Sequence, residues 1–304
     1  MANDFVEQYA KDVRAQGLTT GTILAYRLNI EKFMLFFNKK KITEIDKLDL
    51  RDYVAHMRED KGFTSNTLRY NLAAISSFYE WLIFEGLADS NPVLEVRKRY
   101  LKNYKNDGEK HTHQLISIEQ ASKMVKSCID IRDRAMLMVL FKTGIRRNEM
   151  LSLDIADIDF EDQSILLKPA KKRTNRRVFF DDECSRVLQR WIMIRKERAD
   201  PNCKALFISA PNRRAAESLV QRLTIKAGFR AGVHDPKSDE MEKHFSAHCG
   251  RQWFTTHLRR NGMPREFIQE LRGDKRREAI DTYDHIDPIE LKESYMAYIP
   301  KLGI

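Results

Sequence analysis

Apolar residues along the first ninety positions recur every three or four residues, which is the spacing of amphipathic helices. The apolar stripe within residues 19–37 consists of Ile23, Tyr26, Ile30, Phe33 and Phe37. The stripe within residues 65–86 consists of Leu68, Leu72, Ile75, Tyr79 and Leu82. Thr19 or Thr20 can cap the second helix, and Gly17 and Gly86 are stop signals. We therefore expect a helical domain over residues 1–93, ended by the sequence Ser90-Asn91-Pro92.

The next segment, residues 94–113, is rich in basic residues and has few large apolar side chains after Tyr104. This composition is typical of a linker between domains. Ser117, followed three residues later by Gln120, then forms a capping box that marks a new helix. We expect a second domain over residues 114–304.

The hydrophobic period changes within the second domain. Residues 158–160, 164–167 and 177–180 are short runs with the alternation of β-strands, and the basic segment 168–177 lies where a β-turn is expected. From Asp182 onward the pattern is again mostly helical. The sequence thus predicts a mostly α fold with a small β-sheet, in which a helical domain precedes an α+β domain.

Composition narrows the class of protein. The chain has 304 residues, 42% hydrophobic and 32% charged, which is typical of a globular protein. No apolar run approaches the roughly 18–20 residues that a membrane-spanning helix needs, and the first residues lack the apolar core of a signal peptide. Four cysteines lie far apart without a CxxC pair. We expect a reduced, cytoplasmic protein.

Basic residues dominate the charge balance, with a net charge of +10 and an isoelectric point near 9.3. They gather in blocks, which favours binding to a phosphate backbone over simple solvation. Residues 168–177 contain Lys168, Lys171, Lys172, Arg173, Arg176 and Arg177 and no acid. The expected linker contributes Arg97, Lys98 and Arg99. A polyanion such as DNA is the expected partner.

Several residues can carry chemistry, although each one alone has an ordinary surface explanation. His248 and Arg251 are three residues apart and share a helix face. Arg146 follows Thr-Gly near a helix start, and Glu149 lies one turn later. The sequence has no HExxH, GxxxxGK[ST] or GxGxxG motif. We therefore expect no metal and no cofactor.

Taken together, these residues fit the cleavage of a DNA phosphodiester. Such a reaction requires a nucleophile, cations that stabilise a crowded anionic phosphorane, and a proton for the leaving oxygen. Tyr283 can supply the nucleophile, Arg146 and Arg251 can stabilise the charge, and Lys171 can supply the proton. A cationic pocket would help the tyrosine ionise, because its ordinary pKa is about 10.

The chain resembles the tyrosine recombinases, the family of phage-type integrases and Xer-like recombinases. TGIRRNEMLSLDIADID, residues 143–159, is similar to the box that carries the family's first catalytic arginine, here Arg146, with Glu149 as its acidic neighbour. SAHCGRQWFTTHLRRNG, residues 246–262, is similar to the His-x-x-Arg box and matches His248 and Arg251. Tyr283 follows Arg251 by 32 residues, which fits the family's interval.

The resemblance covers nearly the whole chain. It implies a helical core-binding domain and a catalytic domain that together form a C-shaped DNA clamp, with no further arm-binding domain before residue 1. It also implies a catalytic hairpin lysine, matched to Lys171, with Lys172 or Lys168 as alternatives. Four protomers would exchange DNA strands through a Holliday junction. The tail, residues 287–304, is expected to dock on its own or a neighbouring protomer.

One position departs from the family's pattern. Gly273-Asp274 stands nine residues before Tyr283, where Gly-His or Gly-Trp is usual. An aspartate there would repel the scissile phosphate unless a neighbour such as Arg272, Lys275 or His285 neutralised it. It can instead orient an arginine or accept a hydrogen bond from Tyr283. The cationic run that includes Lys275 and Arg276 is expected to bring a phosphate to the tyrosine.

The expected function is site-specific recombination through a 3′-phosphotyrosyl intermediate. Two alternatives remain at this point. A type IB topoisomerase-like enzyme would use the same nucleophile but would relax supercoils without partner exchange. A catalytically silent DNA-binding relative is the second alternative, and Asp274 is the residue that favours it.

Overall fold

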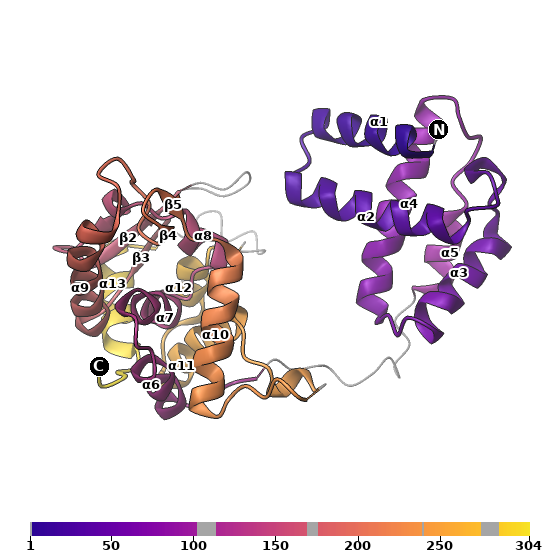
Figure 1. Ribbon diagram of the computed structural model, residues 1–304. Coiled ribbons are helices and arrows are strands. Elements are labelled where there is room, and N and C mark those ends of the chain that lie inside the picture. Colours follow the sequence, from indigo (N-terminus) through magenta and orange to yellow (C-terminus); the bar gives the residue numbers. More distant parts are fainter. Residues whose placement is uncertain (1, 102–113, 169–175, 239, 275–285) are drawn as a thin grey trace. The chain divides into compact units, whose positions relative to one another are not determined.

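The computed structural model describes residues 2–101, 114–168, 176–238, 240–274 and 286–304. The chain divides into two compact units, residues 1–109 and 110–304 (Figure 1). Helices make up most of both units, and strands occur in the second. The predicted mostly α fold with a small β-sheet is therefore confirmed. Among the described helices, none has the length and apolar character that a bilayer crossing requires.

The first unit is built around two long helices whose apolar stripes face each other. Thr19 caps one of them by accepting a hydrogen bond from the Thr22 amide, and Thr64 caps the other through the Thr67 amide, each at 3.2 Å. The elements of this unit are α1 (Ala2–Ala15), α2 (Thr20–Phe36), the 3₁₀ turn η1 (Ile42–Glu44), α3 (Lys47–Glu59), α4 (Ser65–Phe84) and α5 (Val93–Tyr100). The core between them includes Ile30, Phe33, Leu68, Leu72, Ile75 and Phe78, all fully buried.

The expectation that the helical block ends at Ser90-Asn91-Pro92 is wrong. The Asn91 side chain accepts a hydrogen bond from the Val93 amide at 3.1 Å, and Pro92 has the φ of −67° that suits a helix start. Helix α5 follows, and its Val93 and Val96 side chains are 0% and 2% exposed against α3 and α4. Arg97, Lys98 and Arg99, expected in a linker, therefore lie on this helix. Residues 102–113 of the expected linker lie outside the described residues.

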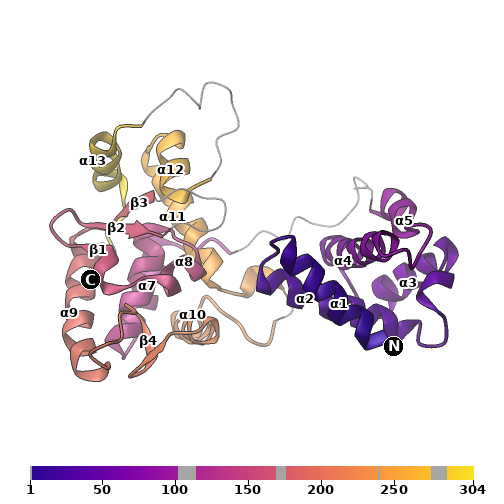
Figure 2. The same cartoon turned by 90° about the horizontal axis from the view of Figure 1, so that it is seen from above.

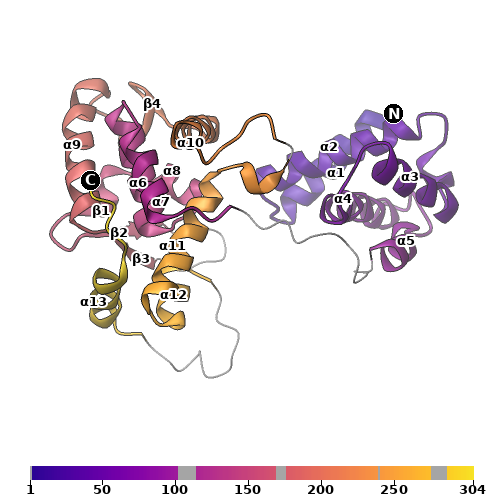
Figure 3. The same cartoon turned by 90° about the horizontal axis from the view of Figure 1, so that it is seen from below.

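The second unit is organised around α7 (Ile131–Thr143), whose residues from Ala135 to Thr143 are all buried. Figures 2 and 3 show α7 running through the interior of the unit between α9 and α11. A helix that is buried on all sides needs apolar residues all round, which explains why α7 shows no clear polar face. The other helices are α6 (Ile118–Lys126), α8 (Arg147–Ser152), α9 (Asp182–Arg198), α10 (Glu217–Ala231), α11 (Ala247–Asn261), α12 (Arg265–Arg272) and α13 (Pro288–Tyr298), with 3₁₀ turns η2 (Ile155–Asp157) and η3 (Met241–Lys243).

Two antiparallel sheets complete the second unit. The first has the order β1-β2-β3, with Ser164 opposite Phe179 and Leu167 opposite Arg176. Its strands, β1 (Ile158–Asp159), β2 (Ser164–Leu167) and β3 (Arg176–Phe179), lie within one residue of the predicted runs. The second sheet, β4 (Ile208–Ala210) and β5 (Arg213–Arg214), falls in a region expected to be mostly helical. Strands this short leave no readable alternation in the sequence.

The end of the chain lies on its own second unit. The Glu183 carboxylate accepts hydrogen bonds from the amides of Leu302, Gly303 and Ile304 at 2.8, 2.6 and 3.0 Å. The same carboxylate accepts a hydrogen bond from the buried Lys142 ammonium at 2.7 Å. In this structure the tail therefore docks on its own chain.

Candidate active site

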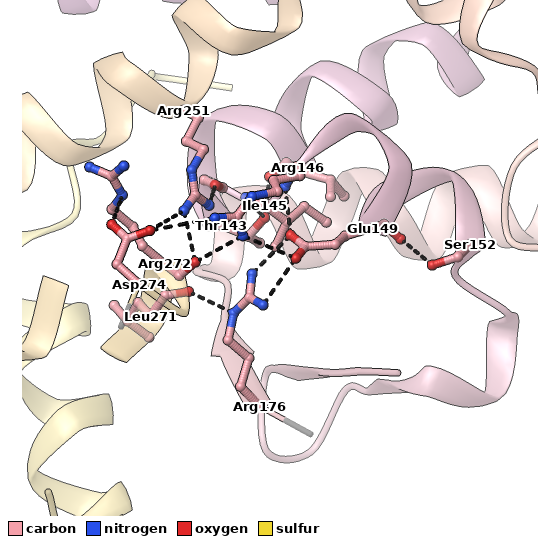
Figure 4. Close-up of polar contacts among 12 residues, drawn as sticks. Thr143, Ile145, Arg146, Glu149, Ser152, Arg176, Arg251, Leu271, Arg272 and Asp274 are labelled. Atoms are coloured by element: carbon pink, nitrogen blue, oxygen red, sulfur yellow. Dashed lines mark hydrogen bonds and ion pairs between the residues drawn. The ribbon is translucent and has the colours of Figure 1, made fainter. Parts of the chain in front are cut away.

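The carboxyl end of α12 gathers the arginines of the site. The Arg272 carbonyl accepts hydrogen bonds from Arg251 Nη2 at 2.7 Å and from Arg146 Nη1 at 3.2 Å (Figure 4). The Leu271 carbonyl accepts one from Arg176 Nε at 3.1 Å. The last carbonyls of a helix lack intrahelical partners and carry its negative dipole end, so they attract cations. Residues from three distant segments are thereby fixed around one helix terminus.

The corner between α7 and α8 sets the position of Arg146. Gly144 ends α7 with a left-handed φ of 59°, and a Cβ added to it would lie 2.3 Å from the Phe254 ring of α11. Only glycine allows both this backbone and this close packing. Arg146 is the N-cap residue of α8, where its amide donates to Glu149 at 2.7 Å and its Nη1 donates to the same carboxylate at 3.2 Å. Glu149 thus binds both the backbone amide and the guanidinium of Arg146.

Arg251 lies one turn into α11 and is 4% exposed. Its Nη1 donates a hydrogen bond of 2.6 Å to the Gly144 carbonyl. Burial, together with the neighbouring Arg146 and Arg272, lowers the pKa of Arg251 to about 10, although Asp274 opposes this shift. The group stays protonated at neutral pH. The guanidinium is consequently a rigidly held cation that needs a nearby anion.

Arg176 was expected on the DNA-contacting surface, but its side chain is buried. It is 9% exposed, and its two Nη groups donate to the Glu149 carboxylate at 3.0 and 2.8 Å. Burial alone would raise the pKa of Glu149, but the hydrogen bonds from Arg176 and from the Arg146 amide lower it to about 2. Because β3 begins at Arg176, strand alternation turns this side chain inward like that of Val178. The expected DNA contact is therefore replaced by a positioning contact.

The Asp274 carboxylate contacts Arg146, Arg251 and Arg272. Gly273 ends α12 with a left-handed φ of 61°, and the Asp274 amide donates to the Gln269 carbonyl at 3.1 Å. The Asp274 Oδ1 atom lies 3.2 Å from Arg251 Nη2 and 3.4 Å from Arg146 Nη2. The Oδ2 atom lies 2.9 Å from Arg272 Nε. The aspartate is thus neutralised by Arg272 and by both arginines expected to hold a phosphate.

The other predicted site residues fall into two groups: those that the structure describes and those outside the described residues. His248 is exposed in the first turn of α11, one turn before Arg251. Lys168, an alternative for the hairpin lysine, forms ion pairs with Asp154 and Asp157 at the end of β2. Arg177 is exposed on β3 and pairs with Asp162 at 2.7 Å. The predicted residues Lys171, Lys172, Arg173, Lys275, Arg276 and Tyr283 lie outside the described residues, as does His285.

The arrangement is suited to binding a small oxyanion. Two guanidinium groups from α8 and α11 converge on one carboxylate oxygen, and backbone carbonyls fix both of them from behind. Guanidinium groups match the geometry of phosphate oxygens. In the described part of the chain no group of three or more His, Cys, Asp or Glu side chains has the geometry of a metal site.

Sequence reasoning missed two contributions. The positioning role of Arg176 was readable in principle, because Val178 is an inward-facing position of the same strand and Arg176 lies two residues before it. The role of the Arg272 carbonyl had no such signal, since any residue presents a carbonyl there. It depends on where α12 ends, and that end is marked only by Gly273.

The comparisons with known proteins identify the family of the chain. Residues 109–289 match the model of the Phage integrase family, and residues 5–89 match the phage integrase N-terminal SAM-like domain. A tyrosine recombinase XerC of Lactobacillus leichmannii is 25% identical over 296 residues, covering 92% of this chain and 93% of that protein. A tyrosine recombinase XerD of Oceanobacillus iheyensis is 24% identical over 303 residues, covering 94% of each.

Solved structures share the fold. A XerH site-specific recombinase bound to palindromic difH substrate superimposes with a TM-score of 0.68 at 19% identity, over 97% of this chain and 80% of that one. A lambda integrase dimer bound to a COC′ core site gives a TM-score of 0.70 at 15% identity, over 94% of this chain and 80% of that one. Since the family model spans more than half of the sequence, the chain belongs to the phage integrase family and is a tyrosine recombinase.

Proposed function

We propose that this chain is a site-specific DNA recombinase that cuts and rejoins double-stranded DNA with Tyr283 as its nucleophile. The observation that carries the proposal is the convergence of Arg146 and Arg251 on a single anionic oxygen beside α12. A scissile phosphate placed there would meet two fixed cations. Preorganised cations of this kind stabilise the negative charge that builds up during phosphoryl transfer.

The proposed step is a transesterification. The Tyr283 oxygen attacks the phosphorus, the bond from phosphorus to the 5′ oxygen breaks, and a 3′-phosphotyrosine forms. The tyrosine gives up its proton to solvent water, and Lys171 donates a proton to the leaving 5′ oxygen. Arg146 and Arg251 bind the non-bridging oxygens, and His248, on the exposed side of α11, donates a further hydrogen bond to the phosphate. Attack by the 5′-hydroxyl of a partner strand reverses the step and rejoins the DNA.

The basic residues fit a DNA-binding role in this scheme. Lys98 and Arg99 are exposed on α5, Arg97 lies beside them, and Arg177 is exposed on β3. Together with Lys168, Lys172, Arg173, Lys275 and Arg276, they are proposed to contact DNA phosphates. Both units, residues 1–109 and 110–304, would then contact the DNA duplex. Four protomers would exchange strands through a Holliday junction in the cytoplasm.

The relatives support this reading. Curated relatives carry the names tyrosine recombinase XerC and XerD, and related folds have been solved on DNA. The roles of the single residues rest on the motifs and on the arginine geometry described above.

Covalent capture tests the proposal. DNA is cross-linked to the protein in cells with formaldehyde, recovered and mapped, and the mapped site is rebuilt as a set of substrates nicked at successive phosphates. Wild type should accumulate a covalent adduct, and Tyr283→Phe should form none. Tyr298→Phe, which makes the same change in the half-buried tail, should behave like wild type. Arg146→Gln and Arg251→Gln should each slow adduct formation by about 10²–10³-fold.

The other outcomes are equally informative. If wild type forms no adduct on its mapped site, the chain is a silent DNA-binding protein and the proposal fails. If the adduct forms and supercoils relax without exchange between partner duplexes, the topoisomerase-like reading replaces recombination.

A further inference from the structure

The Asp274 carboxylate fills the anion site of the DNA-free chain. One of its oxygens lies within 3.4 Å of the Nη2 atoms of both Arg146 and Arg251, and the other lies 2.9 Å from Arg272 Nε (Figure 4). Under the proposed function, the same two Nη2 groups hold the scissile phosphate. The carboxylate and the phosphate therefore require the same donors.

The donors are fixed independently of Asp274. Arg251 is anchored by the carbonyls of Gly144 and Arg272, and Arg146 is anchored by Glu149 and by the Arg272 carbonyl. None of these anchors is supplied by the Asp274 side chain. The anion site would consequently keep its shape when the carboxylate leaves.

The Asp274 backbone is fixed as well, whereas its side chain has room to move. The amides of Gly273 and Asp274 donate to Glu270 and Gln269 at 2.9 and 3.1 Å, which closes the end of α12. The Asp274 side chain is 32% exposed, against 5% for that of Arg251. A rotation of the Asp274 side chain toward solvent would release both arginines without any movement of the Arg272 carbonyl.

We propose that Asp274 is a built-in competitor of the scissile phosphate: its carboxylate occupies Arg146 and Arg251 in the free chain, and a correctly placed DNA phosphate displaces it. This inference rests on the proposed function of the two arginines. In this scheme Asp274 regulates access of a phosphate to the two arginines. A phosphate of poorly matched DNA, which is bound only briefly, finds Arg146 and Arg251 already occupied by the carboxylate. Cleavage of such DNA is therefore suppressed.

The anion affinity of the DNA-free full chain tests this directly, with inorganic sulfate as the probe. Thermal unfolding is followed as sulfate rises at constant ionic strength. A site whose competent state is populated one-tenth of the time or less binds at least about tenfold more weakly than the open site. Asp274→Asn should therefore bind sulfate at least about tenfold more tightly than wild type. Asp274→Ser, which also removes the charge, should show the same gain.

Two controls separate this effect from a general one, because sulfate stabilises many proteins by exclusion from their surface. Asp133→Asn makes the same change in charge at a comparable pair, since Asp133 lies 2.8 Å from Arg132 and is 27% exposed. It should leave the sulfate affinity at the wild-type value. The double variant Arg146→Gln with Asp274→Asn should lose the gain, which would place the sulfate at the arginine pair.

The results distinguish this inference from the proposed function. If Asp274→Asn and Asp274→Ser bind sulfate no more tightly than wild type or Asp133→Asn, the competitor model is wrong, whether or not the DNA adduct forms. If both bind more tightly while wild type forms no adduct on its mapped DNA, the anion competitor stands and the recombinase proposal fails. When both proposals hold, Asp274→Asn also raises adduct formation on mismatched DNA relative to the mapped site.

Discussion

The Arg176 guanidinium donates two hydrogen bonds to the Glu149 carboxylate, at 3.0 and 2.8 Å, and both side chains are largely buried. Glu149 in turn holds the amide and the guanidinium of Arg146. A residue on β3 is thus coupled through one carboxylate to a proposed phosphate-binding arginine on α8. These contacts distinguish Arg176, which positions the site, from the exposed arginines that are proposed to contact DNA.

Arg176 and Arg177, neighbours on β3, should respond differently to the same substitution. Arg177→Gln should reduce the salt slope of DNA binding by about one unit, because an exposed phosphate contact releases about one counterion. Arg176→Gln should leave the slope unchanged and lower the rate of adduct formation. The measurement is DNA affinity at several salt concentrations together with single-turnover cleavage. A reduced slope for Arg176→Gln would restore it as a DNA contact.

The Glu149 cluster should make stability depend on acid pH. Its pKa in the folded chain, about 2, lies below the ordinary value of about 4.3. The carboxylate therefore stabilises the fold above pH 4.3, and this contribution is lost as the pH falls toward 2. At 1.36 kcal/mol per pKa unit, the contribution is on the order of 3 kcal/mol. Urea unfolding should show that Glu149→Gln loses about this much stability at pH 7 and much less near pH 2.

The exposed Glu161 gives a matched control for that experiment. Glu161→Gln should change the free energy of unfolding by less than about 0.5 kcal/mol at either pH, as surface substitutions usually do. A loss for Glu149→Gln that is the same at pH 7 and near pH 2 would show that the charge of Glu149 contributes nothing.

Lys142 should be needed for the docking of the tail. Its ammonium is fully buried and donates to Asp181, Glu183 and the Pro300 carbonyl at 2.7, 2.7 and 2.6 Å. Lys142→Met would leave two carboxylates without their buried partner, and we expect it to lower the free energy of unfolding by about 3–5 kcal/mol.

Lys301 offers the control, because it reaches the same Asp181 at 3.4 Å from an exposed position. Lys301→Met should cost no more than about 1 kcal/mol in urea unfolding, as exposed pairs do. Equal losses for Lys142→Met and Lys301→Met would rule out the buried network as the anchor of the tail.

Gly144 should not tolerate substitution, because of its left-handed φ and also because of its close packing against Phe254. Gly232→Ala, at a φ of 75° with open space around its Cβ, should cost about 1–2 kcal/mol from backbone strain alone. Gly144→Ala adds a clash with the Phe254 ring, which should cost about 1–3 kcal/mol more, and it should displace the carbonyl that holds Arg251. Unfolding and cleavage measured on both variants check this. Equal losses in the two variants would contradict the steric argument.

The sequence predicted the long amphipathic helices well, because they are local patterns. The stripe of α4 and the Thr19 cap are examples. Helix α5 was missed because Pro92 reads equally as the end of one helix and the start of the next. Asp274 could be recognised as unusual and Arg272 as a neighbour that can neutralise it. Its other two partners, Arg146 and Arg251, come from separate segments, and local patterns do not show which side chains meet across a fold.

The identity of the covalently attached residue tests the central claim most directly. Digestion of the trapped DNA adduct with trypsin should give the peptide of residues 278–292, EAIDTYDHIDPIELK, in which Tyr283 is the single tyrosine. Mass spectrometry after nuclease treatment should find a nucleotide on Tyr283, and Tyr283→Phe should yield no modified peptide. A nucleotide attached to any other residue, or an adduct that persists in Tyr283→Phe, would contradict the account.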